Sequence, residues 1–325
     1  MRPFSLLVKP AGAACNIACD YCFYLSKSGI AGGAPAVMPE ETLEKILRSY
    51  LSLPFDSYAV TFQGGEPLLA GRVFFEKAAA VAKSVSGAAG KVAFSVQTNG
   101  ILATDEMAEF FAREGWLLGV SVDGDAGLHD AHRKYRDGRG SFRDVMDALA
   151  VLDAHGCEYN ILALVNADTV RSPERVYRFL RDNINTRFLQ FTQCLEQVGP
   201  EEWDRFLCRI ADVWKNDGDI GRVFVRNIES ALSHILLGRA ADCIYADSCD
   251  GYFVVERNGD VFPCDFSVED SLRLGNAARD PWEKMASDPR RLAFAARKCP
   301  RHNSRNPAAL FERKLRGEII PLLNL

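Results

Sequence analysis

The sequence predicts an α/β fold: a partial (β/α)6 barrel followed by a small C-terminal α+β extension. Short apolar runs alternate with amphipathic helical runs six times, and this rhythm stops near residue 198. Six βα units in a row imply a parallel sheet with right-handed crossovers, and six strands rather than eight leave the barrel open. At 325 residues the chain is long enough for about two domains. We expect the barrel over 1–198, and linker helices with a small module over 199–325.

The predicted strands are short, rich in β-branched and aromatic residues, and followed by Gly, Pro, Asn or Asp. They lie at 5–10, 58–65, 92–100, 117–124, 159–167 and 187–195. Helical runs separate them at 39–51, 74–85, 104–115, 141–156 and 172–183. Several of these runs begin with Ser, Thr or Pro and two are followed by Gly, which is typical of helix ends.

The pattern changes after residue 198. Two helical runs, 201–218 and 229–238, precede a segment in which two apolar runs flank Asn258-Gly259. That dipeptide predicts a hairpin with a type I′ turn. Three cysteines bracket the hairpin, namely Cys243, Cys249 and Cys264.

Composition excludes several classes of protein. The net charge of −4 gives no reason to expect nucleic acid or an anionic membrane as a partner. No segment approaches the ~20 apolar residues that span a bilayer, and the first residues do not read as a signal peptide. Ten cysteines without an export signal predict a cytoplasmic protein with reduced thiols or metal ligands.

The most informative motif is the run CNIACDYC, which spaces Cys15, Cys19 and Cys22 as C-x3-C-x2-C directly after the first strand. A structural zinc site needs a fourth ligand, and none follows within about 20 residues. A disulfide requires an oxidising compartment. Three thiolates can hold three irons of a 4Fe–4S cluster and leave the fourth iron open. We therefore predict an iron–sulfur site that binds and cleaves S-adenosylmethionine (SAM).

The second strand ends in Gln63-Gly64-Gly65-Glu66-Pro67. Two glycines let the backbone approach a ligand closely. Backbone carbonyls and the Glu66 carboxylate can hold an ammonium group there. The alternative is a plain turn, but the position beside a cysteine loop favours a binding site for SAM.

Polar residues also end the third strand (97–100) and the fourth (121–124), and such residues converge on one mouth of a barrel. Ser121 can hydrogen-bond a carboxylate or a ribose, and Arg133 can clamp a carboxylate. The ring of Tyr21 can pack against adenine or cover the cluster from water.

The chain resembles the anaerobic sulfatase-maturating enzymes from about residue 5 to about residue 276. The likeness is carried by CNIACDYCFY, FQGGEPLLAG, QTNG, GVSVDGDAGLHD, NILALVN, FLQFTQCLE and the cysteine-bracketed hairpin. These are radical SAM enzymes with a C-terminal iron–sulfur extension of the SPASM type. The resemblance implies oxidation of a cysteine or serine in a sulfatase to Cα-formylglycine. It implies as partners a nascent or unfolded sulfatase with a C/S-x-P-x-R motif and a reducing donor such as flavodoxin or ferredoxin.

The resemblance also assigns residues. It gives Cys15, Cys19 and Cys22 to the radical cluster, and Cys243, Cys249 and Cys264 to three of the four ligands of an auxiliary 4Fe–4S cluster. It lines the SAM pocket with Tyr21, Gly65, Ser121, Arg133 and Leu189, and makes Asp265 the proton acceptor. The tail departs from the family, because Cys299 is its last cysteine. A second auxiliary cluster is therefore not expected, and Cys299 or His302 would have to complete the first.

Two alternatives remain. Related radical SAM maturases cross-link or epimerise a small ribosomal peptide with the same barrel and extension. A degenerate copy would bind iron and sulfide without complete activity, which the altered tail allows.

Overall fold

The computed structural model describes residues 1–27, 29, 36–85, 87–88, 90–239, 242–246, 248–296 and 309–323. Within these residues, ten strands form one sheet in the order β10-β9-β8-β1-β2-β3-β4-β5-β6-β7. The strands are β1 (Ser5–Val8), β2 (Tyr58–Phe62), β3 (Val92–Thr98), β4 (Leu117–Ser121), β5 (Tyr159–Val165), β6 (Phe188–Gln193), β7 (Phe224–Val225), β8 (Tyr252–Val255), β9 (Asp260–Phe262) and β10 (Gly275–Asn276). Strands β1 to β6 are parallel neighbours in sequence order, which confirms the predicted open (β/α)6 barrel.

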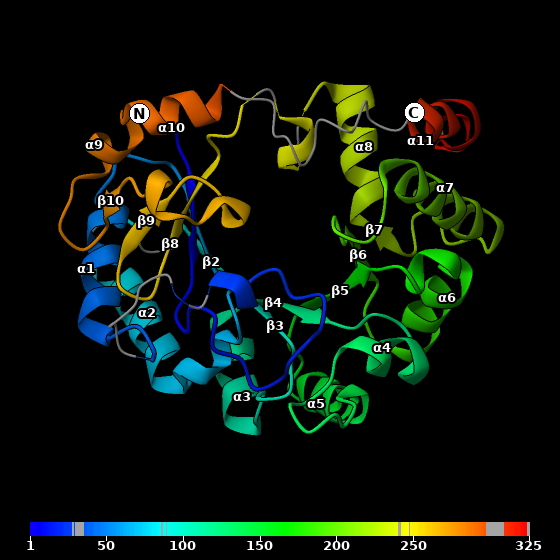
Figure 1. Cartoon of the computed structure of the whole chain (residues 1–325), viewed down its shortest axis with the longest axis horizontal. Helices are drawn as coiled ribbons and strands as arrows, with labels where there is room; N and C mark the ends of the chain where they lie inside the picture. The colour runs from blue at the N-terminus through cyan, green and yellow to red at the C-terminus, as the bar shows by residue number, and fades with distance from the viewer. Residues whose placement is uncertain are drawn as a thin grey trace.

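Helices lie outside the curved sheet, and the ring they form is open on one side (Figure 1). They are α1 (Glu40–Leu51), α2 (Arg72–Ser84), α3 (Asp105–Glu114), α4 (Ala126–His132), α5 (Phe142–Ala154), α6 (Pro173–Asn183), α7 (Pro200–Asn216), α8 (Arg226–Leu237), α9 (Trp282–Ala286), α10 (Pro289–Ala295) and α11 (Ala309–Lys314). The predicted caps explain some helix ends. Thr104 accepts a hydrogen bond from the Met107 amide at the start of α3, and Gly115 ends that helix at φ 65°. The short helix α4 was not predicted from the sequence.

The C-terminal hairpin is continuous with the barrel sheet. Strand β8 pairs in parallel with β1 over Ser5–Val8 and antiparallel with β9. The hairpin itself is confirmed, but its turn differs from the predicted type I′. The Gly259 amide donates to the Glu256 carbonyl, so Arg257 and Asn258 are the central residues, and Gly259 follows at φ 86°. A longer turn closed by a left-handed glycine satisfies the strand twist equally well.

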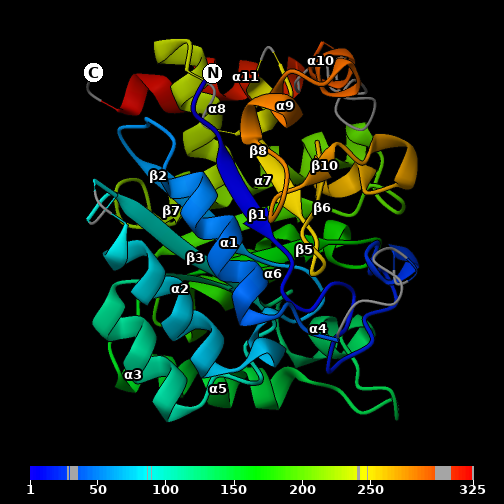
Figure 2. The same ribbon diagram turned by 90° about the vertical axis from the view of Figure 1, so that its left-hand side faces the viewer.

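An aromatic cluster joins this hairpin to the barrel. Phe4 lies 4.7 Å from Phe253 and 5.4 Å from both Tyr50 and Trp282, measured between ring centroids. These rings come from the residue before β1 and from α1, β8 and α9, and Figure 2 shows these four elements side by side. Edge-to-face and tilted contacts add to the stabilisation from burial of the rings. The cluster therefore fixes the extension on the first strand.

The tail folds onto the other end of the sheet. Helix α11 and the π-helical turn η7 (Leu315–Ile319) contact α7 and bury Phe311, Leu315 and Ile319. Lys314 forms ion pairs with Asp212 and with Glu318. Spacing of three buried side chains at i, i+4 and i+8 is that of one helical face. The last described residues are thus a packed element of the barrel wall, although their sequence differs from the family tail.

Candidate functional site

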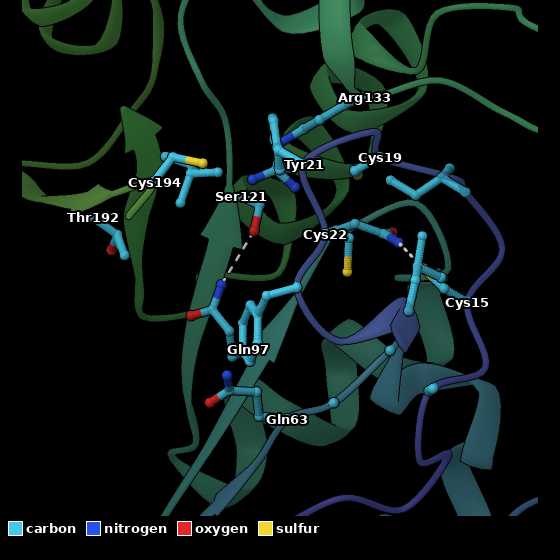
Figure 3. Close-up of a pocket in the computed structure, with 18 of the residues that line it drawn as sticks. Cys15, Cys19, Tyr21, Cys22, Gln63, Gln97, Ser121, Arg133, Thr192 and Cys194 are labelled. Atoms are coloured by element: carbon cyan, nitrogen blue, oxygen red, sulfur yellow. Dashed lines mark hydrogen bonds between the residues drawn. The ribbon is translucent and has the colours of Figure 1, made fainter. Parts of the chain in front are cut away.

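A cavity opens at the carboxyl ends of the parallel strands, under the cysteine loop. Its empty volume is about 1010 Å³. Figure 3 shows the cysteines on one side and Thr192 and Cys194 on the other, with Ser121 and Gln97 between them. The lining includes Ala13, Cys15, Ile17, Cys19, Tyr21, Cys22, Phe23, Gln63, Gly64, Gly65, Gln97, Thr98, Asn99, Ser121, Arg133, Leu164, Thr192, Gln193, Cys194, Leu195, Glu196 and Phe266. This is the end of an α/β barrel where ligands bind.

Backbone hydrogen bonds hold the cysteine loop over the strand ends. The Ala18 amide donates to the Lys134 carbonyl at 2.7 Å, and the Asn99 side chain donates to the Asn16 side chain at 2.7 Å. The Asn99 amide group also approaches the Cys15 sulfur at 3.7 Å. The loop is therefore fixed to both β3 and the segment after α4 before any ligand binds.

The two glycines after β2 serve the loop rather than a ligand directly. The Gly65 amide donates to the Gly12 carbonyl at 2.7 Å, and the Glu66 amide donates to the Ala14 carbonyl at 2.8 Å. A Cβ atom on Gly65 would overlap the Ala14 carbonyl. Close backbone approach thus explains Gly65, as predicted, but the partner in the structure is the cysteine loop. Gly65 also lines the cavity.

Tyr21 and Arg133 converge on a buried carboxylate that the sequence analysis did not assign. The Arg133 guanidinium donates to Asp123 from Nε at 2.8 Å and from Nη2 at 3.1 Å, and the Tyr21 hydroxyl donates to the same carboxylate. Burial alone would raise the pKa of Asp123, but the Arg133 charge overrides it and holds the pKa below its usual value. The predicted clamp on a ligand carboxylate is wrong in this respect, because the Arg133 fork is occupied by Asp123. Arg133 and Tyr21 form part of the cavity wall.

The thiols fit an iron–sulfur cluster. Burial raises the pKa of Cys19 to about 12, with the Arg133 charge opposing the rise, and burial also raises the pKa of Cys15. Such thiols lose their protons readily only when a cation compensates the charge. In the described part of the chain no three His, Cys, Asp or Glu side chains converge on a single metal ion. A cluster does not require this, because each cysteine binds a different iron atom.

Ser121 lies at the end of β4 and accepts a hydrogen bond from Gln97 at 3.2 Å. Both side chains face the cavity, as predicted for Ser121 (Figure 3). On the opposite wall, Thr192, Gln193 and Leu195 complete the lining, and the sequence analysis missed them. Their signal was available: they follow the sixth predicted strand at its carboxyl end.

Two predicted pocket residues lie elsewhere. Glu66 is completely buried, and its carboxylate accepts hydrogen bonds from the Leu68 amide, the Thr98 hydroxyl and the Asn99 amide. Burial raises the pKa of Glu66 to about 7, and those three donors oppose the rise. The carboxylate is used inside the protein, so the prediction that it holds a ligand ammonium group is wrong.

Leu189 is the second residue of β6, pairs with Ile161, and is 1% exposed. It borders a different cavity, beside Tyr159 and Phe188 at the amino ends of the strands. The prediction that Leu189 lines the SAM pocket is therefore wrong, because only the last residues of a barrel strand reach the mouth.

The second group of cysteines is spread over three elements. Cys243 begins the 3₁₀ turn η4 (Cys243–Tyr245) and is exposed, Cys249 lies in a loop beside α10, and Cys264 follows β9. The Tyr252 hydroxyl donates to the Cys264 sulfur at 3.4 Å, and the charge of Cys243 adds to the burial that raises the Tyr252 pKa. Cys243 and Cys264 therefore lie near the same ring. Cys299 and His302, the predicted candidates for a fourth ligand, lie outside the described residues.

Asp265 begins the 3₁₀ turn η5 (Asp265–Ser267) directly after Cys264 and is 7% exposed. Its carboxylate forms an ion pair with Lys9 and accepts a hydrogen bond from the Gln63 side chain at 3.2 Å. Gln63 lines the cavity. Asp265 thus lies one hydrogen bond behind the cavity surface.

Across the described residues, every helix falls short of the length and apolar character that a bilayer span requires.

The comparisons agree with this geometry. The Radical SAM superfamily model matches residues 10–180, and the SPASM iron–sulfur cluster-binding domain model matches residues 247–307. The serine-type anaerobic sulfatase-maturating enzyme of Bacteroides thetaiotaomicron is 34% identical over 91% of this chain and 78% of its own. The cysteine-type enzyme of Clostridium perfringens is 36% identical over 85% of this chain and 78% of its own. The solved structure of native anSMEcpe with bound AdoMet and Cp18Cys peptide has a TM-score of 0.84 at 33% identity, covering 90% of this chain and 82% of that one.

Proposed function

This chain belongs to the anaerobic sulfatase-maturating enzymes of the radical SAM superfamily, and from that premise we propose that it oxidises a cysteine or serine of a sulfatase polypeptide to Cα-formylglycine. One observation carries the proposal. The cysteine loop, the Gly64-Gly65 turn and Ser121 line one cavity at the carboxyl ends of the strands. Relatives of both the serine and the cysteine type are similarly close, so either residue is the proposed target within a C/S-x-P-x-R motif.

The cofactors are a 4Fe–4S cluster and SAM, which the family match and the AdoMet-bound relative support. We assign Cys15, Cys19 and Cys22 to this cluster, and Cys243, Cys249 and Cys264 to an auxiliary cluster. When bound, these groups supply the electron that cleaves SAM into methionine and a hydrogen-abstracting radical, and an acceptor for the electron that the oxidised substrate gives up. A reducing partner such as flavodoxin or ferredoxin, and a cytoplasmic location, complete the proposal.

The chain's own residues have distinct tasks in this proposal. Gly65 keeps the cysteine loop close to β2, and Ser121 with Gln97 offers polar contacts to the nucleotide. Tyr21 and Arg133 shape the wall through Asp123.

Asp265 takes the proton from the substrate thiol or hydroxyl after the Cβ hydrogen atom has left. Gln63 supports this role, because its side chain joins Asp265 to the cavity surface at 3.2 Å. A carboxylate within hydrogen-bond reach is a suitable general base.

Reduced, reconstituted protein should form 5′-deoxyadenosine from SAM and the aldehyde on a peptide containing C-x-P-x-R or S-x-P-x-R, detected by mass. Nucleoside without aldehyde on either peptide would favour the peptide-maturase alternative, and no nucleoside would favour the degenerate copy.

Asp265→Asn should keep the nucleoside and lose the aldehyde. Asp270→Asn, in the same module on η6 (Asp270–Leu272), is the matched control. Normal aldehyde yield in Asp265→Asn would remove Asp265 from the reaction.

A further inference from the structure

Lys9 is a completely buried lysine at the junction between the barrel and the hairpin. It directly follows β1, its side chain is 0% exposed, and its ammonium group lies 4.1 Å from the centre of the Tyr24 ring. Its backbone amide donates to the Val255 carbonyl of β8 at 2.8 Å. A buried ammonium group is costly unless charged partners compensate it.

Two buried carboxylates provide that compensation. Asp265 forms an ion pair with the Lys9 ammonium group. Glu256 is 2% exposed and accepts a hydrogen bond from the Tyr24 hydroxyl. Burial raises the pKa of Glu256, and the Lys9 charge opposes that rise, which puts Lys9 within electrostatic reach of both carboxylates. Lys9 therefore links the first strand to both ends of the hairpin.

The Asp265 carboxylate is fixed at both oxygens. Oδ1 contacts Lys9, and Oδ2 accepts from Gln63, whose side chain lines the cavity. The Lys9 stem passes beside Gly64, where an added Cβ atom would stand 3.2 Å from Lys9 Cδ. Two contacts from different strands define the plane of the carboxylate, and one of them faces the reaction site.

We propose that Lys9 is a positioning residue, which holds the Asp265 carboxylate toward Gln63 and the cavity so that it can receive the substrate proton. This inference rests on the proposed function. In that reaction the Cβ hydrogen atom leaves first. The thiol or hydroxyl proton then passes to Asp265, one electron passes to an iron–sulfur acceptor, and the C=S or C=O double bond forms. Lys9 takes no proton in this sequence, and its charge compensates the carboxylate that does.

The test compares Lys9→Met with Lys27→Met in the full, anaerobically reconstituted chain. Lys27 is the matched control, because its ammonium group donates to the Val268 carbonyl of the same module at 3.1 Å. The measured quantity is aldehyde formed per 5′-deoxyadenosine, together with KM for the peptide. Lys9→Met should lower the ratio on the order of tenfold to a hundredfold, as expected for a misplaced catalytic group, with KM unchanged. Lys27→Met should leave the ratio unchanged, and Lys9→Arg should recover part of it.

A second variant protects against a folding defect. Lys9→Met leaves two carboxylates without their cation, and the addition of Glu256→Gln removes one of them. The double variant should lose coupling relative to Glu256→Gln alone. A wild-type ratio in a folded Lys9→Met protein, or no loss in that pair, would overturn the inference. If Asp265→Asn loses aldehyde while Lys9→Met keeps it, only the role of Lys9 fails, whereas aldehyde in Asp265→Asn removes the proposed proton acceptor itself.

Discussion

The two cysteine groups of this molecule are built in different ways. Cys15, Cys19 and Cys22 lie on one short loop, which backbone hydrogen bonds tie to the ends of β2 and to the segment after α4. The other group draws Cys243, Cys249 and Cys264 from a 3₁₀ turn, a loop and the end of a hairpin. The first group is arranged by local contacts, whereas the second depends on how distant segments pack. We therefore expect the first site to assemble independently of the second.

The largest effect is expected at the first site. Cys19→Ala should abolish assembly of the radical cluster and formation of 5′-deoxyadenosine, because a cluster bound by two cysteines loses one of its fixed corners. Cys208→Ala, on α7, is the control for loss of a thiol. Iron analysis and the nucleoside assay measure both variants. A fully loaded, active Cys19→Ala protein would contradict the ligand assignment.

The next effect tests the docking of the loop. Gly65→Ala should displace the loop, because the new Cβ atom would overlap the Ala14 carbonyl. We expect nucleoside formation to fall by about tenfold or more, since small displacements at a reaction site are costly. Gly317→Ala is the control, as an added Cβ there meets no atom within 4 Å. Unchanged nucleoside formation in Gly65→Ala would mean that the loop needs no such contact.

The independence of the two sites is tested by Cys249→Ala. Iron per chain should fall from about eight to about four, and nucleoside formation should persist while aldehyde formation is lost. Iron counting on the reconstituted variant and the two product assays decide this. Loss of all iron would show that the sites assemble together, and about four irons in the unaltered chain would show that the second site holds no cluster.

The smallest effect concerns the support behind the first site. His129 is buried, accepts a hydrogen bond from the Asp123 amide at 3.4 Å, and burial lowers its pKa to about 4. The unfolded state therefore binds more protons below about pH 6.5, and stability falls as the pH drops from 6.5 toward 4. Between pH 7 and pH 5 this histidine should cost about 2 kcal/mol of unfolding free energy.

His129→Gln should flatten the pH dependence, measured by denaturant unfolding at several pH values. Equal slopes for the variant and the parent chain would contradict this origin of acid sensitivity.

Much of the barrel could be predicted from sequence, because each strand and helix carries its own periodic signal. The six strands, the cysteine loop and the position of Ser121 follow from patterns within a few residues. What failed depends on contacts between segments. The sequence shows that Glu66 follows a strand, but not that three donors enclose its carboxylate. It does not reveal that the Arg133 fork is taken by Asp123, or that β8 pairs with β1.

Leu189 shows a different limit. A likeness between two sequences carries residues across by alignment, and a shift within one strand exchanges the mouth of a barrel for its base. The structure places Leu195 beside the cavity and Leu189 at the far end of the sixth strand. Distance from the end of the strand would have been the better guide.

The pairing of β1 with both β2 and β8 has a consequence for biosynthesis. As the polypeptide leaves the ribosome, β1 and β2 emerge early, whereas the second edge of β1 stays open until Val255 has been made. The floor beneath the cysteine loop is thus finished late in translation. Because long-range strand pairing is slow and exposed edges aggregate, delivery of iron and sulfide is best timed after chain release.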